Sequence, residues 1–133
     1  MKLSIYENID FTKAIQKIYQ SKNSPSVMFK ISSFLEEVSK QEKKYTEIKN
    51  KLLTEYADKD ENGNVKTVEQ NGMVQVTFND NKDNIPKFNK EFKELLDTEF
   101  SLPKIKLSWL DKAELTNAEF IAVKELIEDD TKG

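Results

Sequence analysis

The sequence predicts a helix-dominated α+β fold in a single domain spanning residues 1–133. Apolar residues recur at three- and four-residue spacing along most of the chain, which is the period of an amphipathic helix. One stretch near the middle alternates apolar and polar residues on both sides of an Asn-Gly pair, the strongest short signal for a β-hairpin. A length of 133 residues also fits one domain.

The first elements are expected to be a short strand and a helix. Leu3 and Ile5 alternate with polar residues over residues 2–6, which predicts the strand. Asp10 can cap the helix that follows and that ends near Ser21. The apolar stripe of this helix comprises Phe11, Ala14, Ile15, Ile18 and Tyr19. We therefore expect Tyr19 to face the protein interior with the rest of the stripe.

A long helix is expected over about residues 25–57, because Ser24-Pro25 is a start signal and no glycine or proline follows before Gly63. An apolar row repeats every seven residues along it, namely Ile31, Val38, Tyr45 and Leu52. At about 1.5 Å per residue, such a helix is about 50 Å long, longer than a compact domain of this size is wide. Either part of the apolar row stays uncovered and binds a partner, or the first and last helices and the hairpin cover it. The uncovered row is the reading we favour.

A β-hairpin over about residues 64–78, with Asn71-Gly72 as its turn, should join this long helix to a shorter antiparallel one. Pairing across the turn places five side chains on one face: Val65, Thr67, Val74, Val76 and Phe78. The shorter helix is expected at about 86–99. Its apolar stripe comprises Phe88, Phe92, Leu95 and Leu96.

The C-terminal part should complete the domain with a strand and a helix. Residues 104–107 read as a short strand, which we expect to pair with the strand at residues 2–6. Thr116 and Glu119 have the spacing of a capping box, so the last helix is predicted at about 117–128.

Composition argues against catalysis. The chain contains no histidine and no cysteine, the side chains that most often carry catalysis and transition-metal ligation.

All 21 basic residues are lysines, and they are interleaved with 24 acidic ones for a net charge of −3. Without arginine or a basic stripe, direct nucleic-acid binding is not expected. No apolar run reaches the length of about 18 residues that crosses a membrane. We predict a cytoplasmic, non-enzymatic protein without a cofactor and without membrane contact.

Residues 58–69 match the twelve-residue calcium loop of EF-hand proteins, which is the alternative function. The candidate ligands are the side chains of Asp58, Asp60, Asn62 and Glu69 and the carbonyl of Asn64. Three departures favour a polar turn instead. No helix follows Glu69, Lys66 adds a positive charge within the loop, and no second loop exists.

The favoured function is association with another protein, or with a second copy of the chain, through the long helix. The candidate contact residues are Tyr45, Ile48, Leu52, Tyr56 and Trp109. Trp109, the only tryptophan, has two readings. It is either an anchor for the partner or, because Leu107 and Leu110 flank it, a lid on the core.

Five segments together resemble an uncharacterised family of small proteins from phages and prophages of low-GC Gram-positive bacteria. They are residues 1–7, 56–63, 88–96, 104–108 and 115–120. The resemblance implies a phage context, hence the host cytoplasm, and a connecting turn after the long helix. It implies no assigned activity and no functional residues. A phage protein of this kind would act in virion assembly or inhibit a host factor such as a defence protein.

Overall fold

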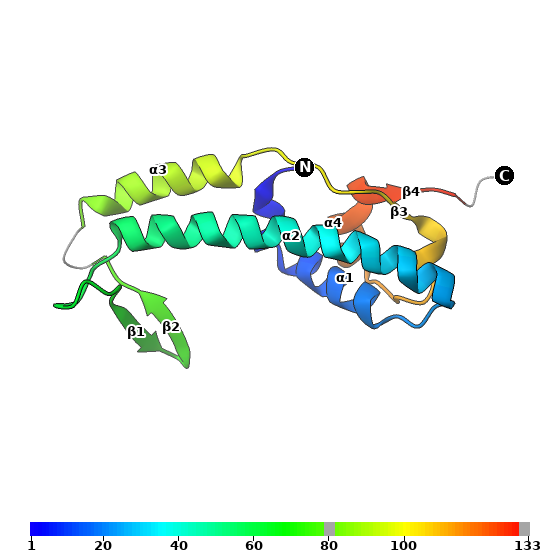
Figure 1. The fold of residues 1–133 in the computed structure, drawn as a ribbon, viewed down its shortest axis with the longest axis horizontal. Helices are drawn as coiled ribbons and strands as arrows, with labels where there is room; N and C mark the ends of the chain where they lie inside the picture. Colours follow the sequence, from blue (N-terminus) through cyan, green and yellow to red (C-terminus); the bar gives the residue numbers. More distant parts are fainter. Residues whose placement is uncertain (79–81, 131–133) are drawn as a thin grey trace. The chain divides into compact units, whose positions relative to one another are not determined.

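The structure is a computed structural model that describes residues 1–78 and 82–130. Four α-helices dominate the described residues: α1 (Ile9–Gln20), α2 (Pro25–Tyr56), α3 (Asn84–Leu96) and α4 (Asn117–Val123) (Figure 1). Short 3-10 helices are η1 (Leu3–Glu7), η2 (Leu107–Leu110) and η3 (Lys124–Leu126). The predicted helix-dominated class with a small antiparallel sheet is confirmed.

Two small two-stranded sheets complete the described fold. Strands β1 (Thr67–Gln70) and β2 (Met73–Val76) pair antiparallel. Strands β3 (Ile105–Lys106) and β4 (Ile127–Glu128) pair in parallel.

Contacts within the chain divide it into two compact units. Unit 1 comprises Met1–Lys43 and Glu99–Gly133, and unit 2 comprises Lys44–Thr98. Helix α2 is continuous from Pro25 to Tyr56 and contributes its first part to unit 1 and its last part to unit 2. The predicted range for this helix, about 25–57, differs from the observed range by one residue.

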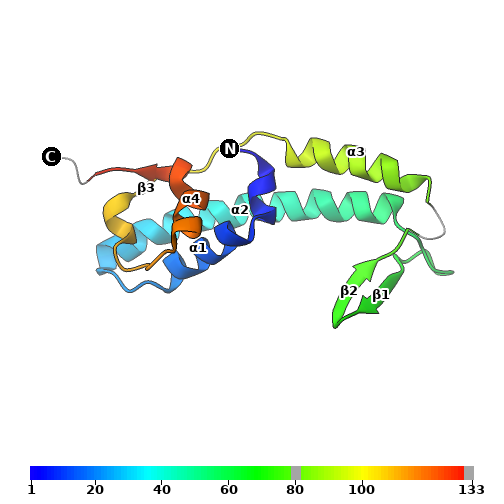
Figure 2. The same ribbon diagram turned by 180° about the vertical axis from the view of Figure 1, so that it is seen from behind.

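Unit 1 holds the main hydrophobic core. Helix α4 lies beside α1 in both views (Figures 1 and 2). The buried side chains include Phe11, Ala14 and Ile18 from α1 and Ile31, Phe34 and Val38 from α2, with Ile105, Val123 and Leu126 from the C-terminal part.

The Tyr6 ring packs against Phe11 and Phe100, and its hydroxyl donates to the Val38 carbonyl at 2.9 Å. Burial raises the pKa of Tyr6 above its ordinary value.

The N-terminal segment is not the strand that its alternation predicts. Leu3–Glu7 forms η1, and only Lys2 makes an isolated bridge, to Glu99. Leu3 and Tyr6 stand three residues apart, so a 3-10 helix turns both to the same side. The prediction that residues 2–6 form a strand and pair with residues 104–107 is therefore wrong. Residues 105–106 pair instead with 127–128, at the end of the segment predicted to be helical.

Side chains cap the starts of α1, α2 and α4, whereas the start of α3 has no side-chain cap. Asn8 rather than Asp10 caps α1, since its Oδ1 accepts from the Asp10 N–H at 2.9 Å. Ser24 Oγ accepts from the Val27 N–H at 3.4 Å and caps α2 as predicted. Thr116 and Glu119 form the predicted capping box at α4.

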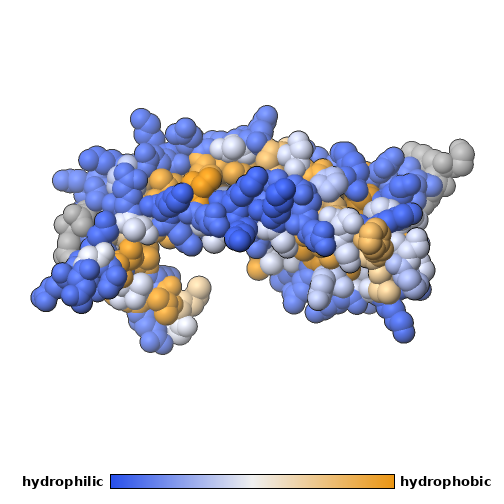
Figure 3. Space-filling model, in the orientation of Figure 1, coloured by the Kyte–Doolittle hydropathy of each residue, from blue (hydrophilic) through white to orange (hydrophobic). Residues whose placement is uncertain are grey.

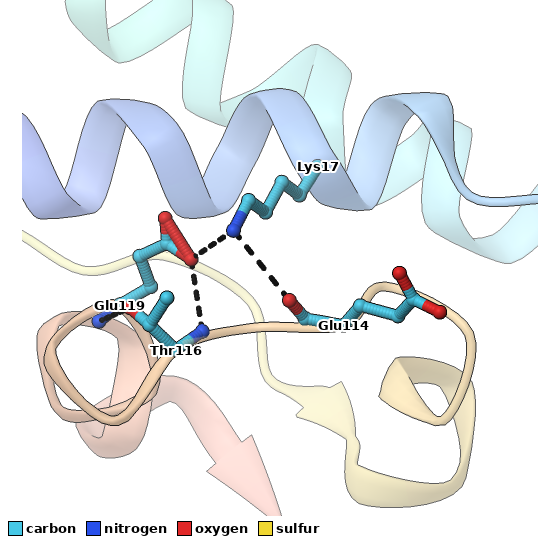
Figure 4. Close-up of polar contacts among 4 residues, drawn as sticks. All are labelled: Lys17, Glu114, Thr116 and Glu119. Atoms are coloured by element: carbon cyan, nitrogen blue, oxygen red, sulfur yellow. Dashed lines mark hydrogen bonds and ion pairs between the residues drawn. The ribbon is translucent and has the colours of Figure 1, made fainter.

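An ion pair ties this capping box to α1. The Glu119 carboxylate, only 3% exposed, accepts from Lys17 Nζ at 2.5 Å and from the Thr116 N–H at 2.9 Å (Figure 4). Lys17 also reaches the Glu114 carbonyl at 3.5 Å. These donors, Lys17 first, lower the pKa of Glu119.

Unit 2 combines the last part of α2, the hairpin and α3. An aromatic series runs from the hairpin end into α3, with ring centroids of Phe78 and Phe88, and of Phe88 and Phe92, 5.4 Å apart. The Asn84 side chain donates to the Tyr56 carbonyl at 3.2 Å and so satisfies one of the last carbonyls of α2. A hydrogen bond with the Glu91 carboxylate raises the pKa of Tyr56 to about 12.

Asp58 connects the end of α2 to both strands of the hairpin. Its N–H donates to the Thr77 carbonyl and its carbonyl accepts from the Lys66 N–H, both at 2.8 Å. Its carboxylate accepts from the Thr77 hydroxyl at 2.7 Å and is almost fully buried. One residue thus holds the base of the hairpin through main chain and side chain.

None of the helices in the described part of the chain is long and apolar enough to cross a membrane.

Candidate functional site

The predicted contact residues do not form one exposed surface. Tyr45 is only 3% exposed, so its side chain is not available on the surface, contrary to its predicted role. Leu52 and Tyr56 are half-buried, and Ile48 is 45% exposed. Trp109 packs against the core of unit 1, which agrees with the reading as a lid. The seven-residue row is thus largely covered by the chain itself, because Ile31 and Val38 are also buried.

Two aromatic side chains of unit 1 are exposed instead. Tyr19 lies in the last turn of α1 and Phe29 in the second turn of α2, and each is 75% exposed. Each of these side chains leaves on the order of 100–200 Å² of surface that association can bury. They are the residue types that most often anchor protein interfaces.

A short capped connection holds the two helices that carry these rings. The Ser21 hydroxyl donates to the Ile18 carbonyl at 2.7 Å and accepts from Asn23 Nδ2 at 3.0 Å. Ser24 then caps the start of α2, four residues after α1 ends at Gln20. Local hydrogen bonds therefore stabilise the end of α1, the connection and the start of α2.

An open groove of about 430 Å³ lies between these helix segments. It is lined by Tyr19, Ser32, Leu35, Glu36 and Ser39. Leu35 is half-buried against the core and supplies an apolar floor, while the serine hydroxyls and the Glu36 carboxylate are polar groups at its sides. Phe29 does not line the groove; it precedes the lining residue Ser32 by about one turn of α2. We call Tyr19, Phe29 and these lining residues the aromatic groove.

The sequence contained a signal for Phe29. It stands two residues before Ile31, and a rotation of about 200° places it on the opposite side of the helix from the apolar row. An aromatic residue outside the buried row of a helix is either exposed or covered by another element. Tyr19 had no comparable signal, because it extends the apolar stripe of α1 by one position.

The groups of the aromatic groove can contact another chain. Hydroxyls, one carboxylate and apolar surface can bind and orient another chain. In the part of the chain that the structure describes, no cluster of three or more histidine, cysteine, aspartate or glutamate side chains could hold a metal ion.

The structure spreads the predicted calcium ligands over two elements. Asp58 Oδ2 accepts from Thr77, and Asp60 Oδ1 accepts from the N–H groups of Asn62 and Asn64 at 2.9 and 3.0 Å. The Asn64 carbonyl accepts from the Asp60 N–H at 2.7 Å. Glu69 belongs to β1, opposite Val74. Residues 58–66 thus form an internally bonded turn. Calcium binding remains a prediction, which a calorimetric titration with Ca²⁺ tests.

Comparisons with protein-family models, with curated proteins and with solved structures found no match for this chain.

Proposed function

We propose that this protein acts without catalysis, by binding an amphipathic helix of another protein in the aromatic groove. The single observation that carries the proposal is a groove lined by Leu35 and by the Tyr19 ring, which is 75% exposed, with a second ring of equal exposure, Phe29, about one turn before the groove on α2.

The shape and chemistry of the groove favour a helical ligand. Two helices joined by a short connection form its walls, and a third helix can lay apolar side chains at three- and four-residue spacing along such a groove. Leu35 and the two rings would receive that apolar stripe. Ser32 and Ser39 can donate to polar groups at the edge of the partner helix, and Glu36 favours a lysine or arginine there.

The resemblance of the sequence to a phage and prophage family supports a phage setting. Two roles remain open in that setting. The partner is a host factor, such as a defence protein that the chain inhibits, or a phage protein in virion assembly. Both roles need a protein-binding surface, and the aromatic groove offers one.

A quantitative capture experiment tests the proposal. The wild-type protein and Phe29→Glu and Tyr19→Glu variants are immobilised and exposed to lysates of uninfected and phage-infected host cells. Loss of a hot-spot ring costs about 2 kcal/mol or more, which corresponds to about 30-fold weaker binding. A specific partner should therefore be retained by the wild type and lost by both variants.

Ile9→Glu is the matched control, because Ile9 is also on α1 and 63% exposed. It stands ten residues from Tyr19, about 15 Å along the helix. A partner kept by Ile9→Glu and lost by Phe29→Glu supports the groove, and a synthetic peptide from its sequence should gain helical circular dichroism on binding. If every captured protein is retained equally by all variants, the groove is not the binding surface. Host and phage partners distinguish inhibition from assembly.

A further inference from the structure

The β1–β2 hairpin of unit 2 exposes apolar side chains on a segment with little charge. Val68, Met73 and Val74 are 42%, 64% and 70% exposed. Glu69 is the single charged residue from Thr67 to Val76, in a chain of which 34% of the residues are charged. Figure 3 shows apolar residues gathered over this hairpin at the lower left, whereas most of the visible surface is hydrophilic. Depletion of charge is typical of the centre of an interface.

The pairing register of β1 and β2 determines which main-chain N–H and C=O groups point away from the other strand of the hairpin. Gln70 pairs with Met73 across the two-residue turn, and Val68 pairs with Gln75. These are the hydrogen-bonded pairs, so the N–H and C=O groups of the residues between them point outward. On β2 the outward groups belong to Val74 and Val76. No third strand of the described residues pairs with this sheet.

The outer edge of β2 is the more open of the two. On the other side, Lys59 forms an antiparallel bridge with Val65, two residues before β1 begins. Strand β2, with the sequence Met-Val-Gln-Val, also lacks the lysine or proline that commonly protects an exposed edge.

We propose that β2 pairs antiparallel with β2 of a second copy of this chain, about a two-fold axis through Gln75, so that two hairpins form one four-stranded sheet. Val74 of each copy then lies opposite Val76 of the other. Their outward N–H and C=O groups match in this register and make four hydrogen bonds.

The second copy fits this edge for four reasons. The same register satisfies all four outward groups on both strands. The four valines of the two strands come together on one face of the sheet, where each Val74 loses much of its exposure. Gln75 meets its own copy at the axis, and its amide carries both donors and an acceptor. No charge on β2 opposes self-pairing.

The pairing is expected to be weak, since four hydrogen bonds and four valines make less than a standard interface. We expect a dissociation constant on the order of 100 µM. Sedimentation velocity over concentrations from tenfold below to tenfold above that value should show a reversible monomer–dimer equilibrium. A monomer throughout the series would overturn the proposal.

Single-cysteine variants test the register, because the chain has no cysteine of its own. At the axis the Gln75 Cα atoms stand about 4.5 Å apart, within the range that a disulfide spans. Gln75→Cys should therefore form a covalent dimer under mild oxidation. Val68→Cys is the matched control on β1, and its two copies would lie about 14 Å apart, three strand spacings, so it should stay monomeric.

Gln75→Lys completes the test by placing two like charges opposite each other at the axis. It should raise the dissociation constant at least about tenfold, while Val68→Lys, with the same charge on the other strand, should have a smaller effect. If Val68→Cys cross-links as readily as Gln75→Cys, or if Gln75→Lys dimerises like the wild type, β2 is not the contact.

Discussion

Glu119 shows how one buried charge can hold two distant parts of the chain. Its carboxylate is nearly inaccessible, yet it accepts hydrogen bonds from Lys17 of α1 and from the main chain of Thr116. A buried carboxylate without such donors would be strongly destabilising. The same side chain therefore caps α4 and ties it to α1, which lies about a hundred residues earlier in the sequence.

This ion pair makes the stability of unit 1 depend on pH. The pKa of Glu119 is lower in the folded protein than its ordinary value of 4.5. Its contribution is therefore complete above pH 4.5 and is lost as the pH falls through the folded pKa. Glu119→Gln should lower the melting temperature at pH 7, and the difference from the wild type should shrink toward acid pH.

Glu114→Gln is the appropriate control, because Lys17 contacts the carbonyl of Glu114 and the Glu114 carboxylate points away from it (Figure 4). This variant should melt like the wild type across the pH range. A Glu119→Gln variant with an unchanged pH profile would show that the ion pair contributes nothing to the acid dependence.

At the scale of elements, the hairpin depends on its two-residue turn. Asn71 and Gly72 have φ angles of +53° and +78°, the left-handed region that a type I′ turn requires. A side chain at Gly72 would meet no atom within 4 Å, so its cost lies in the backbone conformation and not in a clash. Gly72→Ala should therefore destabilise the hairpin by about 1 kcal/mol.

Amide hydrogen exchange measures this effect locally. The N–H groups of the hydrogen-bonded pairs beside the turn should exchange faster in Gly72→Ala, while those of α3 should be unchanged. Gly72→Asn is the matched variant, because asparagine tolerates the left-handed region. Equal exchange in Gly72→Ala and wild type would mean that the turn conformation does not limit hairpin stability.

At the scale of the whole molecule, α2 is the element that both units share. The boundary between the units falls at Lys43 and Lys44, in the interior of this helix. Proline at this point removes one main-chain hydrogen bond and clashes with the preceding turn, which costs about 3 kcal/mol. Because each unit packs on its own part of α2, Lys44→Pro should weaken both units.

Hydrogen exchange followed by mass spectrometry can separate the two responses. In Lys44→Pro, peptides from α1 in unit 1 and from α3 in unit 2 should both lose protection. Lys44→Ala should leave both unchanged, since Lys44 is exposed and alanine favours a helix. Loss confined to one unit would show that the other does not need an intact α2.

The contact residues predicted from the sequence include Tyr45 but neither Tyr19 nor Phe29, the most exposed aromatic side chains of unit 1. Tyr45 belongs to the regular apolar row and is buried, whereas Phe29 lies outside that row and is exposed. Periodicity identifies which side chains share a face of a helix, but it does not say whether another element covers that face. The groove combines Tyr19, at the end of α1, with residues 32–39 of α2, so it depends on how these two helices pack.

The sequence by itself determined the features that depend on neighbours in the chain. The long helix, the Asn-Gly turn and the Thr116–Glu119 capping box all arise from hydrogen bonds and backbone preferences within a few residues. Only the tertiary structure decided that residues 105–106 pair with 127–128, that residues 3–7 are helical, and which apolar faces stay in water. Such choices depend on competition among distant segments for the same buried surface, and that competition leaves no periodic signal in the sequence.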